Sequence, residues 1–304
     1  MARLSASNSA AASSANGHIS APSIATSAGP ASLLPSTSHS NVGDSKPVED
    51  DNIPDTDWED EAVDTAPLPM DDSLFPGGTR DLSYIGVQAF FLGNVFAAGI
   101  SGTITTIVLG SAWWRLSAFA TSLALFHFLE YFTTARYNTP ALRAESFLLF
   151  NNGRAYQVAH GCATLELIVS RFLPQYGQTF VNPLTIALGI ALIIVGQLVR
   201  SLAMAQAGPS FNHVIAREHK EHHKLVTHGL YSIFRHPSYF GFFWWAIGTQ
   251  FLVGNKVCLV GYIIVLWQFF SRRIQGEEKF LVNFFGDKYI EYKKKTGTKI
   301  PLIR

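Results

Sequence analysis

Two polar segments near the carboxyl end of the chain carry the side chains best suited to bind a carboxylate and an aromatic ligand. The first is HKLVTHGLYSIFRHPSY, residues 223–239, and the second is RRIQGEEKFL, residues 272–281. In the second segment Arg273 and Glu277 are four residues apart, so on a helix they share one face. A guanidinium fork matches the geometry of a carboxylate. We therefore expect Arg273 to bind a carboxylate and Glu277 to orient that arginine or the substrate, although a solvated helix leaving a membrane would carry similar charges.

The first segment offers apolar and aromatic surface. Val226, Tyr231 and Tyr239 could contact an adenine ring, and the face of a tyrosine attracts a cation such as a sulfonium. Gly229 and Pro237 interrupt regular structure, which leaves backbone groups available to a ligand. The alternative is an ordinary interfacial loop with its tyrosines and histidines at the depth of lipid headgroups.

Long apolar runs must position these two segments. A transmembrane helix needs about 20 mostly apolar residues, and candidate spans lie at 84–108, 112–134, 156–174, 183–206, 238–254 and 256–271. The sequence therefore predicts an all-α, polytopic integral membrane protein with six transmembrane helices, or eight if the first two regions each split. Gly254-Asn255-Lys256 joins the last two runs and predicts a tight helical hairpin, which returns both polar segments to one membrane face.

The charge distribution supports this membrane assignment. Residues 1–72 hold 2 basic and 12 acidic side chains, whereas the remaining residues hold 21 basic and 10 acidic ones. Nucleic acid could explain a basic body, but these basic residues lie between apolar runs, so we expect the lipid bilayer and no nucleic acid as a partner. Because Lys and Arg collect in the loops on the side of the amino terminus, both polar segments should face the cytosol.

Some ionisable residues fall inside the predicted spans, where charge is costly. These residues are Glu130, Glu166 and Arg200. Glu130 lies close to Arg136 near the end of a span, so we expect it to snorkel toward the interface. For Glu166 a functional and a structural role stay equally open.

The run ending in RHPSY directly before an apolar hairpin resembles the signature of isoprenylcysteine carboxyl methyltransferases and related phospholipid methyltransferases. Arg273, Glu277, Glu278 and Leu281 meet the family pattern of Arg, three residues, Glu-Glu, two residues, Leu. GPSFNHVI at 208–215 resembles the family's Asn-Phe-Asn-His stretch, but Ala216 stands where members often have Gln. The resemblance implies that S-adenosylmethionine is bound by His223, Lys224, Leu225, Val226, Tyr231, His236, Pro237, Ser238 and Tyr239.

The resemblance also implies a reaction and a substrate, and together with the Ser-, Ala- and Pro-rich composition of the first 82 residues it divides the chain into three parts. The reaction is methyl esterification of the carboxyl-terminal prenylcysteine of farnesylated or geranylgeranylated proteins, at the cytosolic side of the endoplasmic reticulum. A carboxylate is ionised at neutral pH and needs no general base, and the irregular REHKEHH run favours a solvated loop over a metal site. Residues 1–82 would form a disordered tail, residues 83–207 the first transmembrane helices, and residues 208–304 the methyltransferase core.

Three alternatives stay open at this point. A phospholipid-amine methyltransferase would share the architecture, but the Arg273/Glu277 pair favours a carboxylate substrate. A sterol reductase also carries an RHP-like element, but it needs more spans and a nicotinamide cofactor. A non-catalytic membrane scaffold would bind no cofactor and would not depend on Arg273.

Overall fold

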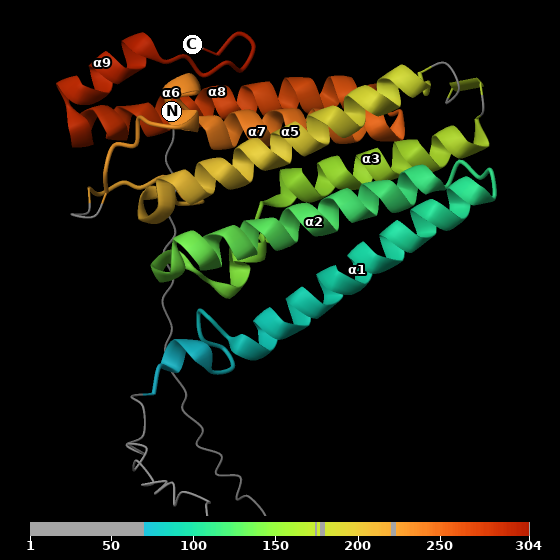
Figure 1. Ribbon diagram of the computed structural model, residues 1–304, viewed down its shortest axis with the longest axis horizontal. Coiled ribbons are helices and arrows are strands. Elements are labelled where there is room, and N and C mark those ends of the chain that lie inside the picture. Colours follow the sequence, from blue (N-terminus) through green and yellow to red (C-terminus); the bar gives the residue numbers. More distant parts are fainter. Residues whose placement is uncertain (1–69, 174, 177–179, 220–222, 304) are drawn as a thin grey trace, which may run out of the picture. The chain divides into compact units, whose positions relative to one another are not determined.

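A computed structural model of the chain describes residues 70–173, 175–176, 180–219 and 223–303. The regular elements in these ranges are helices (Figure 1). The α-helices are α1 (Leu82–Val108), α2 (Trp114–Tyr137), α3 (Arg154–Phe172), α5 (Pro183–Ala207), α6 (Leu230–Ile233), α7 (Pro237–Val253), α8 (Val257–Phe285) and α9 (Asp287–Lys295). Short 3-10 helices are η1 (Asp72–Leu74), η2 (Thr139–Ala141), η3 (Ala144–Phe147) and η4 (Gly208–Ser210).

Helices α1, α2, α3, α5, α7 and α8 coincide with the predicted spans. By length and composition, α1, α8 and the stretch Pro183–Ser210 are long and apolar enough to cross a membrane. Helix α8 differs from the prediction because it continues from the apolar run to Phe285 without a break. Arg273 and Glu277 therefore lie on the same rigid helix as the last span.

The predicted amino-terminal tail lies mostly outside the described residues. Residues 1–69 are not described, whereas residues 70–81 form η1 and a turn that leads into α1. Asp81 caps that helix, since its carboxylate accepts a hydrogen bond of 3.0 Å from the backbone N–H of Tyr84.

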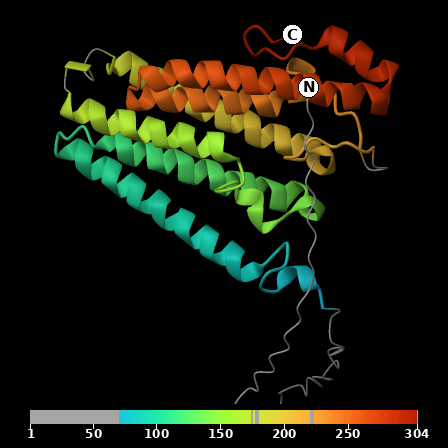
Figure 2. The ribbon, with the colours of Figure 1, turned by 180° about the vertical axis from the view of Figure 1, so that it is seen from behind.

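The helices pack in antiparallel pairs (Figures 1 and 2). Helix α1 lies along α2, α5 packs against α7, and α3 contacts α8. Helix α9 turns back beside the carboxyl-terminal end of α8, near the short helix α6. This end of the bundle holds both polar segments that the sequence singled out.

Glycines bring α5 and α7 unusually close together. Gly189 and Gly196 on α5 face Gly248 and Gly241 on α7, and a Cβ atom added at Gly196 would lie only 2.5 Å from the backbone nitrogen of Trp245. Small residues at such positions let helix backbones approach each other. The close approach is what allows side chains of α5 to reach the first turn of α7.

The hairpin between α7 and α8 is as tight as predicted. Gly254 ends α7 in the left-handed region with φ +77°. The Glu166 carboxylate of α3 accepts hydrogen bonds from the backbone N–H groups of Lys256, Val257 and Cys258, at 2.7, 2.9 and 2.6 Å. Glu166 therefore caps the first turn of α8, and this contact gives it a structural role.

The glycine contact between α5 and α7 can be tested with Gly196→Ala. The added methyl group would press on the backbone of α7, and we expect a loss of about 1–3 kcal/mol of stability, measured by thermal denaturation in detergent. Gly93→Ala on α1 is the matched control, because nothing lies within 4 Å of its added Cβ. Equal melting temperatures for the two variants would contradict the close packing.

Candidate active site

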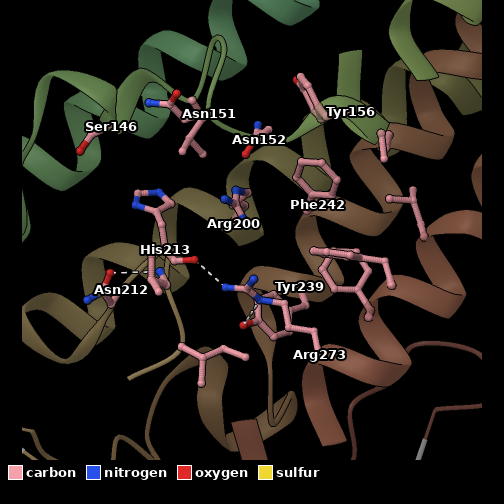
Figure 3. A pocket seen from close by; sticks show the side chains of 18 of the residues that line it. Ser146, Asn151, Asn152, Tyr156, Arg200, Asn212, His213, Tyr239, Phe242 and Arg273 are labelled. Carbon is pink, nitrogen blue, oxygen red and sulfur yellow. Dashed lines mark hydrogen bonds between the residues drawn. The ribbon is translucent and has the colours of Figure 1, made fainter. Parts of the chain in front are cut away.

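A large cavity opens among α3, α5, α7, α8 and the segment after η4 (Figure 3). Its volume is about 1580 Å³. The polar part of its wall includes Arg200, His213, Tyr239 and Arg273, which lie near one another in the close view. The cavity continues between α3 and α8, where the wall is mostly apolar. One space therefore joins a charged end to an apolar groove.

Arg273 is held on two sides at the charged end. Its Nε donates to the hydroxyl of Tyr239 at 2.8 Å, and its Nη2 donates to the backbone carbonyl of His213 at 2.5 Å (Figure 3). The Tyr239 hydroxyl in turn donates to Glu277 at 2.5 Å. Within the described part of the chain, Nη1 of Arg273 makes no hydrogen bond. Arg273 thus keeps one donor nitrogen for a ligand in the cavity.

The ring of Tyr239 is packed against its neighbours. It stacks on His236 with 5.4 Å between ring centroids and an interplanar angle of 6°, and on Phe270 at 5.1 Å. The guanidinium carbon of Arg273 lies 5.5 Å from the ring centroid. The cation that this ring contacts in the structure is therefore Arg273, and the hydroxyl of Tyr239 links Arg273 to Glu277.

Glu278, the neighbour of Glu277, connects α8 to the residues before α7 and to α9. It is buried, and its Oε1 accepts from Nε of Arg235 at 2.5 Å and lies 3.2 Å from Nε2 of His236. Its Oε2 pairs with Lys293 of α9. Arg235 also donates to the carbonyl of Thr296 at 2.6 Å. The family pattern marked Glu278, but its role as the partner of these groups was not visible in the sequence.

A second buried ion pair lies deeper in the bundle. Glu130 of α2 is 1 % exposed, and both of its oxygens bond to Arg200 of α5, with Nη2 and Oε2 2.6 Å apart. Nε2 of His213 lies 3.0 Å from the same Oε2. The expectation that Glu130 snorkels beside Arg136 is wrong, because an arginine 70 positions away is within reach in the fold.

The structure distributes the residues predicted to bind a cofactor over four places, of which Tyr231 occupies one by itself. His223 and Tyr239 line the cavity with Arg273. His236, Pro237 and Ser238 are buried where α7 begins. Lys224, Leu225 and Val226 form an irregular stretch anchored to η4, where the backbone N–H of Lys224 donates to Ser210 at 3.1 Å.

Tyr231 is placed away from the cavity lining. Its hydroxyl donates to the carbonyl of Ala203 at 3.3 Å, and its own carbonyl accepts from the hydroxyl of Tyr292 at 2.6 Å. Burial raises the pKa of Tyr292 to about 12, so this hydroxyl remains a donor at neutral pH. Tyr231 thus fixes α6 between α5 and α9.

Known proteins are similar to this chain in sequence. Residues 188–283 match the isoprenylcysteine carboxyl methyltransferase (ICMT) family. A protein-S-isoprenylcysteine O-methyltransferase of Saccharomyces cerevisiae is 51 % identical over 193 residues, which are 62 % of this chain and 80 % of that protein. The chain belongs to the isoprenylcysteine carboxyl methyltransferase family. The Homo sapiens protein-S-isoprenylcysteine O-methyltransferase is 40 % identical over 221 residues, covering 72 % of this chain and 75 % of its own.

The fold of this family member also has a solved counterpart. The structure of the eukaryotic intramembrane Ras methyltransferase ICMT is 33 % identical, with a TM-score of 0.67 over 72 % of this chain and 77 % of that one. The match confirms the prediction of an all-helical, polytopic integral membrane protein. It also confirms the family resemblance that rested on the RHPSY and Arg-Glu-Glu residues.

The role of Glu278 can be tested with Glu278→Ala. Removing this carboxylate leaves Arg235 buried without its partner, and we expect a loss of about 3–5 kcal/mol of stability, seen as a lower melting temperature in detergent. Glu291→Ala, at an exposed position of α9, should change stability by no more than about 0.5 kcal/mol. A Glu278→Ala protein that melts with the wild type would contradict the assignment.

Proposed function

We propose that this protein transfers a methyl group from S-adenosylmethionine to the carboxylate of a carboxyl-terminal prenylcysteine. The observation that carries the proposal is the position of Arg273, which lines the cavity one helical turn from Phe269 of the apolar groove and keeps one donor nitrogen without a bond to the described residues. A prenylcysteine has the same combination of a carboxylate beside an apolar chain. The curated relatives that match this chain carry the name of this activity.

Arg273 would orient the carboxylate for attack. The hydroxyl of Tyr239 donates a hydrogen bond to Glu277, so the lone pairs of its oxygen can accept one from Nε of Arg273. Together with the carbonyl of His213, this fixes the plane of the guanidinium and leaves Nη1 to donate to a substrate carboxylate. A carboxylate is already ionised at neutral pH, so positioning and partial removal of water are what this site has to provide.

The cavity has room for a cofactor beside the lipid. Sites for small molecules usually enclose about 300–1,000 Å³, and this cavity of about 1580 Å³ exceeds that range. Residues 211–215 and Arg217 line part of it without regular secondary structure, and Phe211 and Phe280 add aromatic surface. S-adenosylmethionine supplies an electrophilic methyl group when bound. We assign its binding to this segment together with the predicted set around His223 and Tyr239.

The groove between α3 and α8 suits a prenyl chain. Ala159 and Cys162 of α3 line it together with Gly261, Val265 and Phe269 of α8. Gly261 and Arg273 are twelve residues apart on one helix, which corresponds to about 18 Å along its axis. Val265 and Phe269 are also partly exposed on the outer surface of α8. A prenyl chain could therefore enter from the bilayer while its carboxylate reaches Arg273.

We also propose that the site faces the cytosol at the endoplasmic reticulum. The support is the excess of basic residues at the end of the bundle where α9 carries Lys293, Lys294 and Lys295. Loops rich in Lys and Arg stay on the cytoplasmic side of a membrane.

The first test measures base-labile methyl ester on a farnesylcysteine analogue with labelled S-adenosylmethionine. Arg273→Ala should lower kcat/KM by about 100-fold, because it removes the charged partner of the carboxylate. Arg272→Ala is the matched control, since Arg272 is exposed on the same helix, and it should retain activity. Methylation of a phospholipid amine in place of the prenylcysteine would overturn the substrate assignment. Absence of cofactor binding would leave the scaffold alternative.

The groove is tested by Gly261→Phe, which fills the end far from Arg273. Nothing lies within 4 Å of a Cβ added at Gly261, so the backbone can accept the change. We expect KM to rise more for a geranylgeranyl than for a farnesyl substrate, with kcat nearly unchanged, because the longer chain reaches further along the groove. Ile264→Phe, on the exposed side of α8, is the control. Equal KM changes for both substrates would contradict this path.

A further inference from the structure

We infer that the buried pair of Glu130 and Arg200 positions Arg273, although neither residue belongs to the segments that the reaction assigns to cofactor or substrate. The inference rests on the proposed role of Arg273 as the carboxylate anchor. It concerns two groups that orient this guanidinium, the carbonyl of His213 and the hydroxyl of Tyr239. Each of them is connected to one member of the buried pair.

The first connection runs through His213. Its ring nitrogen Nε2 lies 3.0 Å from Oε2 of Glu130, and since a carboxylate only accepts, this nitrogen is the donor. The carbonyl of the same residue accepts from Nη2 of Arg273 at 2.5 Å. His213 lies in a segment without regular secondary structure. No helix fixes this carbonyl, so its position depends on side-chain bonds, which are the bond from His213 to Glu130 and the bond of 2.7 Å from Asn138 to the carbonyl of Phe211.

The second connection runs through Ser238. Nη1 of Arg200 donates to the hydroxyl of Ser238 at 2.9 Å. Ser238 directly precedes Tyr239 in the first turn of α7. The backbone N–H of Tyr239 donates to the carbonyl of His236 at 3.1 Å, and the contact from Arg200 adds a side-chain restraint to the same turn. Arg200 therefore helps to fix the residue whose hydroxyl accepts from Arg273.

The pair also keeps a second cation from competing with Arg273. Arg200 lines the same cavity, and its guanidinium carbon lies 5.5 Å and 5.3 Å from the ring centroids of Phe126 and Phe242. Two of its nitrogens are engaged by Glu130. Without that carboxylate, Arg200 would present an unpaired charge to the anionic end of the substrate. Glu130 thus leaves Arg273 as the group that receives the carboxylate.

The experiment compares the affinity of purified full-length protein for farnesylcysteine and for the corresponding amide, which has no negative charge. Wild type should prefer the carboxylate, and Arg273→Ala should remove that preference. Glu130→Gln should reduce the preference by about tenfold while the amide binds as before. In the Arg273→Ala background, Glu130→Gln should not lower the ratio of the two affinities any further.

Two further variants keep the test decisive. Glu166→Gln is the matched control, because it neutralises another carboxylate within the bundle that caps α8 far from Arg273, and it should leave the ratio unchanged. If Glu130→Gln does not fold, Glu130→Gln combined with Arg200→Gln replaces both charged groups by neutral amides, which leaves no unpaired charge between the helices, and should show the same reduced ratio.

The outcomes separate this inference from the function on which it rests. Equal weakening of carboxylate and amide binding in Glu130→Gln would mean a purely structural pair and would overturn the inference alone. A carboxylate preference that requires Arg273 but is unchanged in Glu130→Gln would also overturn the inference alone. A wild type with no preference for the carboxylate would overturn the proposed anchor, and the positioning role with it.

Discussion

A charged side chain among apolar helices costs free energy unless partners compensate it, and the arrangement of this bundle follows from meeting that requirement. Glu166 is compensated by backbone N–H groups at the start of α8, and Glu278 by Arg235, which precedes α7, and by Lys293 of α9. Glu130 is compensated by Arg200 and His213. Each carboxylate therefore connects segments that are distant in the chain. The contacts of Glu130 and Glu278 are the ones that lie near the cavity residues Arg273 and Tyr239.

Close packing of α5 against α7 makes the contacts of Arg200 possible. Gly196 and Gly241 remove the side chains that would keep α5 and α7 apart. At ordinary helix separation Arg200 would be further from Ser238, which it now contacts at 2.9 Å. The glycines thus act on the polar site although they carry no functional group. Steric and electrostatic requirements meet in the same two helices.

Much of the fold could be predicted from local sequence, because apolar runs of sufficient length form helices in a membrane whatever their partners are. The hairpin at Gly254 and the shared face of Arg273 and Glu277 were predictable for the same local reason. The pairing of Glu130 with Arg200 was not, since it depends on how α2 packs against α5. Nor could the sequence reveal that the ring of Tyr239 contacts Arg273. The same holds for the hydroxyl of Tyr239, which accepts a hydrogen bond from Arg273 and donates one to Glu277.

The continuity of α8 explains why one helix can serve two unlike parts of a substrate. Its apolar stretch lines the groove, and one further turn presents Arg273 without any hinge between them. A rigid helix fixes the distance from groove to guanidinium, so a prenyl chain seated in the groove would bring its carboxylate to a defined height. Tyr239 and the carbonyl of His213 then need to set only the rotation of the guanidinium, which is a smaller task than setting its position. Because the backbone of α8 sets the position of Arg273 and side-chain contacts set only its rotation, the site needs few contacts to orient the guanidinium.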